Sequence, residues 1–255
     1  MKAFVSLLLC IGSIFSEPIR TIPEELYDAF TENGSIKVNS WYLNDSYGSD
    51  QPRKWSVSEI KNYCRLISKG KSFYYGATDL YLYKALKQFP ISGKSVAIIG
   101  SITPWYECVV LTYKGKPTTI EYNTIECDDP RIEIFTVEEF NANPKTFDCI
   151  ISISSIEHDG LGRYGDPINP YGDFEAMQKC KEMLNPGGIF YLAVPVTEDS
   201  ITFNAHRTYG KIRLPKLLSG WKVLNSYGFD ESNFTLDSTK NFFHQPVFVL
   251  TADNS

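Results

Sequence analysis

Acidic, basic and imidazole side chains occur close together in the stretch IEHDGLGRYGDP, which runs from residue 156 to residue 167. A histidine next to a carboxylate can accept a proton from a hydroxyl group, so His158 and Asp159 are candidate catalytic residues. His206 is a third candidate, because it follows the strand predicted to lie next to the one before His158. Three further polar residues of the stretch are expected to contact the substrate: Arg163, Tyr164 and Asp166.

The same residue types suggest two other kinds of site. Ser154 and Ser155 precede the histidine, as in a hydrolase, but sequence neighbours rarely form a catalytic triad and the chain has no GxSxG motif. The histidines and aspartates could bind a divalent metal, yet their spacing fits no known metal motif, so we expect none. A structural alternative stays open, in which these side chains brace the loop through ion pairs and hydrogen bonds.

Short apolar runs predict the strands that must position these residues, at 96–99, 118–122, 132–135, 149–153, 189–194, 221–227 and 246–251. The first five are continuous apolar runs, which are typical of parallel strands covered on both faces. The clearest helix begins at Gly172 and ends at the NPGG turn of residues 185–188. The last two strands lack a helical crossover, which favours antiparallel pairing. We predict an α/β fold, a doubly wound sheet of about seven strands.

Residues 17–90 are predicted to form an N-terminal extension with two helices, ahead of a main domain at residues 91–255. The first helix begins at the capping box SVSE, residues 56–59. The second begins at the Thr-Asp pair of residues 78–79. The part of the extension before the first helix is expected to be an irregular lead-in, with one short helix at PEELYDAF.

The first residues, MKAFVSLLLCIGSIFSEP, have the pattern of a secretory signal peptide, and their apolar run is too short to span a bilayer. We predict that residues 1–16 are removed and that the protein is secreted or enters the secretory lumen. A buried helix or a signal anchor is the alternative. Five cysteines then remain, in a spacing that fits neither a disulfide framework nor a metal motif. Three glycosylation sequons are weak support for a secreted glycoprotein: Asn33, Asn44 and Asn233.

The charge of the chain argues against one class of partner. The formal net charge is −5, and no run of lysine and arginine occurs. Nucleic-acid binding requires a basic face that neutralises phosphates, so we expect no nucleic-acid partner. A small molecule or a glycan is the expected partner.

Ligands of doubly wound sheets bind beyond the carboxyl ends of the strands, near the point where the winding reverses. The stretch SVAIIGSITPWYE contains the first predicted strand of the sheet, the turn after it and the start of the next helix. It keeps Gly100, but Ile102 and Pro104 stand where further glycines would allow close backbone approach to a ligand. Trp105 could stack on a bound base or pack beneath the helix, and we favour packing.

Two parts of the chain resemble a known superfamily. FDCIISISSIEHDGLGRYGD and AMQKCKEMLNPGGIFYLAVP are similar to class I S-adenosylmethionine-dependent methyltransferases, in which a fourth strand precedes a helix, a PGG turn and a fifth strand. YYGATD, IGSITPWYE, IEYN and SSIEHDGLGRYGDP together look more closely like domain-of-unknown-function family 268, described from Caenorhabditis proteins. The resemblance covers about residues 91–255 and implies a Rossmann-like, methyltransferase-type fold.

The resemblance also implies S-adenosylmethionine as cofactor. Glu121 follows Gly100 by 21 positions, the spacing expected for a carboxylate that binds both ribose hydroxyls. A surface glutamate at a strand end is the structural alternative. The implied cofactor-binding residues are Gly100, Ser101, Glu121 and Ser154.

Two functions from different classes follow. The first is methyl transfer to a small molecule or glycan, supported by Glu121 and the polar loop around His158. The second is a secreted or lumenal binding protein that kept the fold without catalytic activity, supported by the signal peptide and the missing glycines.

Overall fold

The structure, a computed structural model, describes residues 19–43 and 52–253 of the 255-residue chain. The predicted signal peptide at residues 1–16 and the sequon at Asn44 lie outside the described residues. Among the described residues, no helix is both long enough and apolar enough to cross a membrane.

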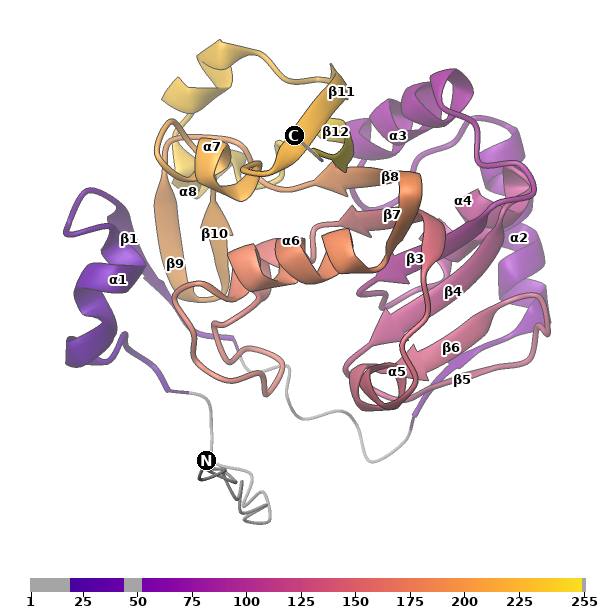
Figure 1. Ribbon diagram of the computed structural model, residues 1–255, viewed down its shortest axis with the longest axis horizontal. Helices are drawn as coiled ribbons and strands as arrows, with labels where there is room; N and C mark the ends of the chain where they lie inside the picture. Colours follow the sequence, from indigo (N-terminus) through magenta and orange to yellow (C-terminus); the bar gives the residue numbers. More distant parts are fainter. Residues whose placement is uncertain (1–18, 44–51, 254–255) are drawn as a thin grey trace, which may run out of the picture.

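A seven-stranded mixed sheet forms the centre of the protein, in the order β11-β12-β8-β7-β3-β4-β6 (Figure 1). The neighbouring strands from β8 to β6 are parallel, whereas β12 is antiparallel to both β8 and β11. From β3 the chain winds out to β6 and then returns to β7, so the winding reverses between β3 and β7. The strands are β3 (Ser95–Ile99), β4 (Lys116–Glu121), β6 (Glu133–Thr136), β7 (Phe147–Ile153), β8 (Leu184–Ala193), β11 (Trp221–Tyr227) and β12 (Val247–Ala252). The predicted doubly wound α/β fold is confirmed, as is the antiparallel pairing of the last two strands.

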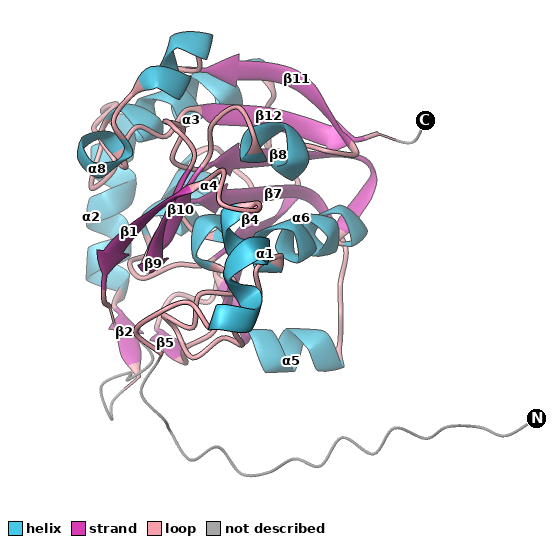
Figure 2. Cartoon of the chain, turned by 90° about the vertical axis from the view of Figure 1, so that its left-hand side faces the viewer, coloured by secondary structure: helices cyan, strands magenta, loops and turns pink. Residues whose placement is uncertain are grey.

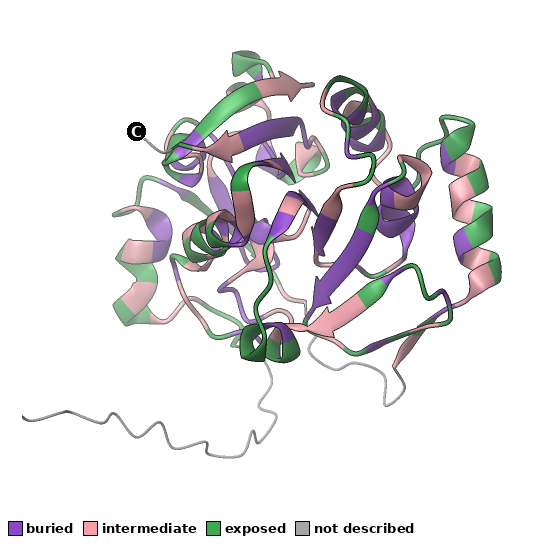
Figure 3. Ribbon diagram, turned by 45° about the vertical axis from the view of Figure 1, so that its right-hand side comes forward, coloured by how far each residue is buried: buried purple, intermediate pink, exposed green. Residues whose placement is uncertain are grey.

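Two apolar layers hold helices against the two faces of this sheet. Successive side chains of a strand point to opposite faces, so Val96 and Ile98 of β3 join one layer and Ala97 joins the other. The strands that carry these side chains are buried over most of their length (Figure 3). The first layer contains side chains of α2 (Val57–Ser68), α3 (Ala77–Gln88) and α4 (Trp105–Thr112). The second contains side chains of α5 (Val137–Ala142), α6 (Gly172–Glu182) and α7 (Arg213–Leu217).

The first helix of the N-terminal extension begins where the sequence predicts, and the second, α3, begins at Ala77, one residue before the predicted Thr78. Ser56 Oγ accepts a hydrogen bond from the Glu59 amide at 3.2 Å, which is the serine half of the expected capping box. A short helix is also present near PEELYDAF, as η1 (Glu24–Leu26) and α1 (Tyr27–Thr31).

The expectation of an otherwise irregular lead-in is wrong, because this segment contributes two strands. β1 (Lys37–Trp41) pairs in parallel with β9 (Ser200–Asn204), which pairs antiparallel with β10 (His206–Thr208) (Figure 2). β2 (Arg53–Trp55) pairs in parallel with β5 (Ile125–Cys127). The side chains of β1 are mostly exposed, so the strand lacks the alternation of apolar and polar residues by which a strand is recognised in sequence.

Three short helices complete the described elements. They are η2 (Ile156–His158), directly after β7, and η3 (Glu231–Thr235) and α8 (Ser238–Asn241), which lie between β11 and β12. Residues from the loops at the carboxyl ends of β3, β4, β7 and β8 line one pocket together with residues of β10 and of the segment after α8, at one edge of the sheet.

Candidate functional site

Two adjoining pockets lie at this edge. The larger has a volume of about 480 Å³, and its lining includes residues at or just after the ends of β3, β4, β7 and β8. The smaller, of about 290 Å³, lies between β4, α5 and α6. They adjoin because both are lined by the same residues where β3, β4 and β7 end: Gly100, Glu121, Tyr122, Ser155 and Asp159.

Glu121 lies beside Gly100 at the junction of the two pockets. Its side chain is buried, and its Oε2 accepts a hydrogen bond from the Ser101 amide at 2.7 Å. The other oxygen, Oε1, accepts one from the Tyr122 amide at 2.9 Å. Oε1 also accepts a longer hydrogen bond from the Asn123 amide at 3.4 Å, so of the two oxygens it is Oε2 that keeps a lone pair for a ligand. The structure thus brings together three of the predicted cofactor-binding residues.

Hydrogen bonds between polar side chains hold the loop after β3, the loop that lacks the expected glycines. The Ser101 hydroxyl lies 3.1 Å from Oε2 of Glu107, and the Thr119 hydroxyl donates to Oε1 of the same carboxyl group at 2.7 Å. Glu107 is fully buried, and burial raises its pKa to about 7. The loop therefore has a defined conformation, set by a buried acid and two hydroxyl groups.

Trp105 packs in the core and lines neither pocket. Its indole is 2% exposed and stacks on Phe73, with ring centroids 5.1 Å apart. Tyr63 meets the same indole edge-on at 5.4 Å. This geometry agrees with the packing role favoured from the sequence, and the indole fills neither pocket.

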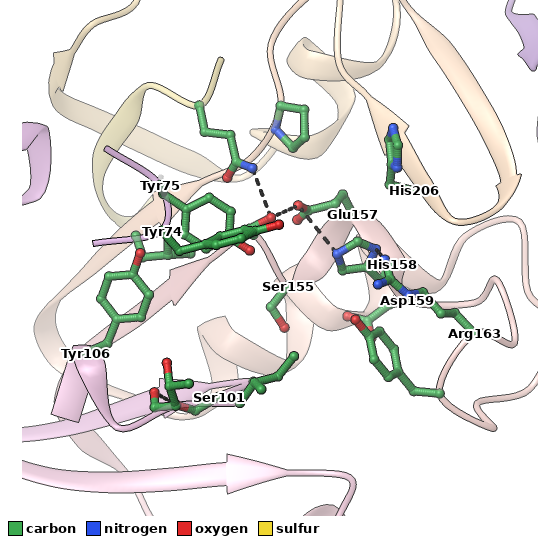
Figure 4. A pocket seen from close by; sticks show the side chains of 18 of the residues that line it. Tyr74, Tyr75, Ser101, Tyr106, Ser155, Glu157, His158, Asp159, Arg163 and His206 are labelled. Atoms are coloured by element: carbon green, nitrogen blue, oxygen red, sulfur yellow. Dashed lines mark hydrogen bonds and ion pairs between the residues drawn. The ribbon is translucent and has the colours of Figure 1, made fainter. Parts of the chain in front are cut away.

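Glu157 is a site residue that the sequence reasoning passed over. It lines the larger pocket with 1% of its surface exposed, and its Oε1 accepts a hydrogen bond from Ser154 Oγ at 2.6 Å (Figure 4). Gln245 Nε2 donates to the same serine hydroxyl at 2.9 Å. The other oxygen, Oε2, is buried without a hydrogen-bond partner in the described part of the chain. Burial raises the pKa of Glu157 to about 7, so its protonation changes near neutral pH.

The sequence offers only a weak signal for this role. Glu157 follows a buried strand, but so do its neighbours His158 and Asp159. A histidine beside an aspartate is the more familiar catalytic pattern, so it drew attention away from the glutamate. Ser154, which was predicted to bind the cofactor, instead contacts Glu157. Gly100 and Ser101 lie beside Glu121.

His158 lies next to Glu157 with a defined tautomer. Its Nδ1 is 2.6 Å from the carbonyl oxygen of Ala205, which can only accept, so we assign the ring hydrogen to Nδ1. Its Nε2 is therefore an acceptor, and it lies 3.7 Å from Glu157 Oε1. Burial lowers the pKa of His158 to about 3, so the ring is neutral at physiological pH.

The other two predicted catalytic residues line the same pocket. His206 stacks on Phe242 at 5.3 Å, away from the pair of Glu157 and His158 (Figure 4), and burial lowers its pKa to about 4. Asp159 lies where the two pockets meet, and burial, together with the nearby carboxylate of Asp166, raises its pKa well above the ordinary value. The structure thus gathers the three residues in one pocket without joining the two histidines.

The predicted substrate-binding residues divide into two groups. Arg163 and Tyr164 line the larger pocket, with the guanidinium carbon 5.0 Å from the centre of the tyrosine ring. Asp166 instead accepts hydrogen bonds from the amides of Gly160 and Gly162, at 2.7 and 3.1 Å, and it lines only the smaller pocket. Asp166 therefore matches the bracing alternative. No group of three or more ligating side chains suited to a metal ion occurs within residues 19–43 and 52–253.

Aromatic side chains that the sequence analysis did not assign to a site form much of the pocket wall. Phe73, Tyr74 and Tyr75 come from the loop before α3, and Tyr106 comes from α4. Asp79 fixes this wall, because its two oxygens accept from the Tyr106 hydroxyl at 3.0 Å and the Phe73 amide at 2.6 Å. Three more rings continue this wall: the centroid of Phe243 lies 5.7 Å from that of Tyr74 and 4.4 Å from that of Phe242, and Trp41 lies 6.4 Å from Phe242. The feature of the sequence that could have indicated this aromatic wall is the high aromatic content of the chain.

Solved structures of methyltransferases share this fold. The 1,6-didemethyltoxoflavin-N1-methyltransferase of Burkholderia thailandensis, solved with 1,6-didemethyltoxoflavin and S-adenosylhomocysteine, has a TM-score of 0.54 at 13% identity, over 76% of this chain and 87% of that one. An S-adenosylmethionine-dependent methyltransferase from Clostridium acetobutylicum has a TM-score of 0.45 at 11% identity, over 75% and 96% of the two chains. Such low identities establish similarity of fold alone. No curated protein matches the sequence.

One family profile matches the chain over residues 93–249, which include β3 and the first half of β12. Its description is "Caenorhabditis protein of unknown function, DUF268". With more than half of its length matched, and with the seven-stranded sheet of methyltransferases, the chain belongs to the DUF268 family.

Proposed function

We propose that the protein is an S-adenosylmethionine-dependent methyltransferase that acts on a small molecule. The observation that carries the proposal is the position of the Glu121 carboxyl group, beside Gly100 where the two pockets meet. The Burkholderia enzyme of the same fold was solved with 1,6-didemethyltoxoflavin and S-adenosylhomocysteine, which supports the assignment.

The residues present are compatible with this cofactor. The smaller pocket has apolar walls from Ile99, Ile120, Val137 and Phe140, which suit a flat base, and Glu121 at its edge suits ribose hydroxyls. When bound, the cofactor would supply an electrophilic methyl group. The chain's own contribution is to orient the acceptor in the larger pocket, to exclude water with its aromatic walls, and to take up a proton.

A binding protein without catalytic activity is the second candidate. Both oxygens of Glu121 already accept backbone hydrogen bonds, from Ser101 and Tyr122, so the carboxylate has a structural role that needs no ligand. The side chain of Ile102, where a glycine was expected, is 55% exposed. Both observations agree with a pocket that keeps the fold and takes a different ligand.

Calorimetric titration with S-adenosylmethionine and S-adenosylhomocysteine distinguishes the two. We expect micromolar binding by the protein that starts at residue 17, and a loss of at least about tenfold in Glu121→Ala. The matched control is Glu126→Ala, because Glu126 makes an exposed ion pair with Lys54 and lines neither pocket. Absence of binding up to millimolar ligand, or equal binding by both variants, would contradict the transferase proposal.

A further inference from the structure

We propose that the larger pocket takes a primary or secondary amine as methyl acceptor, with Glu157 as its counter-ion and proton acceptor. The proposal rests on the transferase function above and names its substrate class and a catalytic residue. It is argued from the hydrogen-bond donors, the charges and the rings around Glu157.

The hydrogen-bond donors next to Glu157 already have acceptors. The Ser154 hydroxyl gives its only hydrogen to Glu157 Oε1, and His158 gives the hydrogen on Nδ1 to the Ala205 carbonyl. When Glu157 is ionised, its Oε2 and His158 Nε2 are therefore both acceptors, and Oε2 has no donor within the described residues. A buried acceptor without a donor is unfavourable, so a ligand that fits here must bring donors of its own. An ammonium group brings two or three.

The surrounding charges leave Glu157 able to bind a cation. Arg207 directs its guanidinium to the backbone oxygens of Asp159 and Asn169. Arg163 Nη1 lies 3.4 Å from Ala205 O and from His158 Nδ1, the ring nitrogen that does not face Glu157. Both arginines favour the charged form of Glu157, yet burial has the larger effect and raises its pKa to about 7. The carboxyl group can thus both bind an ammonium ion and accept its proton at neutral pH.

The rings beside Glu157 favour a cation over a neutral donor. Tyr74, Tyr75 and Tyr106 lie on one side of its carboxyl group in the pocket (Figure 4). Aromatic faces attract cations, most strongly where water is excluded. A hydroxyl acceptor would satisfy Oε2 but would gain little from these rings, so the amine is the better match.

The reaction balances without a further reactant. A bound ammonium ion loses one N–H proton to Glu157, and the freed lone pair forms a bond to the methyl carbon of the sulfonium. The carbon–sulfur bond breaks with its electron pair left on sulfur, which gives a neutral thioether and a methylated ammonium ion. Glu157 then releases the proton to solvent.

A pair of probes of nearly equal shape tests the proposal: benzylammonium chloride and benzyl alcohol. Each is titrated into the protein from residue 17 onward, with and without S-adenosylhomocysteine, at pH 8, and binding is measured by calorimetry. We expect benzylammonium to bind at least about tenfold more tightly than the alcohol, as a charge-assisted hydrogen bond would give. Glu157→Gln should abolish the difference, whereas Glu182→Gln, on the exposed surface of α6, should keep it.

A pH series on the wild-type protein tests the role of Glu157 even if the variant fails to fold. Benzylammonium stays protonated at pH 6 and pH 8, and His158 stays neutral, so protonation of Glu157 should weaken its binding to the wild type at pH 6. Asp159 also lines the pocket with a raised pKa, so the pH effect must disappear in Glu157→Gln to be assigned to Glu157. Equal binding of the two probes, no amine binding by folded wild type, or amine preference retained in Glu157→Gln would each overturn the proposal. Amine selectivity without S-adenosylhomocysteine binding would instead show that the transferase function fails while the amine site stands.

Discussion

A Cβ atom on Gly100 would lie 2.4 Å from the hydroxyl oxygen of Ser155, so the loops after β3 and β7 are in contact at the position where a side chain is missing. Gly100 also has a φ of +72°, in the left-handed region that side chains disfavour. One glycine of the expected glycine-rich loop therefore remains at the point where the two loops leave no room for a Cβ.

Gly100→Ala should destabilise the protein by about 1–3 kcal/mol, through backbone strain and contact with Ser155. Urea denaturation measures the loss. Gly187→Ala is a matched control, because Gly187 has a φ of +75° but no atom within 4 Å of the added Cβ. The double variant Gly100→Ala/Ser155→Gly should recover the part due to contact. Equal losses in the two alanine variants would show that the loops can separate easily.

Glu107→Gln should stabilise the protein at alkaline pH. The pKa of Glu107 is about 7 in the folded protein against an ordinary 4.5, so the folded state holds a proton that the unfolded state has lost between these values. Stability from this group consequently falls as pH rises from 4.5 to 7 and stays low above pH 7. The amide removes the buried charge, while the hydroxyls of Ser101 and Thr119 can still bond to it.

We expect a gain of up to about 3 kcal/mol at pH 8 and little change at pH 4.5, measured by urea denaturation at both pH values. Glu126→Gln, at an exposed ion pair, should show no such pH dependence. A Glu107→Gln variant that loses stability at pH 8 would mean that the carboxylate is needed as an anion.

Asp173→Asn should be strongly destabilising, because it removes the buried anion of Arg213 and leaves the partly exposed Glu32 as the ion-pair partner of that guanidinium. Arg213 Nη2 lies 2.7 Å from both oxygens of Asp173, and both side chains are almost fully buried. Breaking such a pair from one side costs about 3–5 kcal/mol. Lys216→Ala is the contrast: it breaks the more exposed ion pair with Glu32 and should cost less than about 1 kcal/mol in the same denaturation experiment.

Secretion remains a prediction, and it leads to a specific glycosylation pattern. We propose that the mature chain begins near Glu17 and that, of the two described sequons, only Asn33 is modified. Asn33 is exposed, whereas Asn233 is 9% exposed and its Oδ1 accepts the Asp230 amide at 2.8 Å. N-terminal sequencing and glycopeptide mass spectrometry of protein secreted by insect cells test this. An intact Met1 or a glycan on Asn233 would contradict it.

The central sheet could be predicted because several of its strands, such as β3 and β7, are apolar runs that end in recognisable turns. Glu121 and Gly100 could be paired from spacing alone, since consecutive parallel strands bring their carboxyl ends together. Glu157 could not be singled out, because its role depends on burial and on an unpaired oxygen, which require the packing of distant residues such as Gln245. β1 was missed for a related reason: its five residues, four of them exposed, pair with β9, more than a hundred positions away along the chain.

The wall of tyrosines and phenylalanine at residues 73–75, together with Trp41 on β1, precedes residue 93, where the match to the family begins. The larger pocket is thus assembled from two stretches of the chain, with these rings before the matched region and Glu121 and Glu157 within it. Replacing the rings at residues 73–75 would therefore change the pocket wall while leaving both carboxyl groups in place.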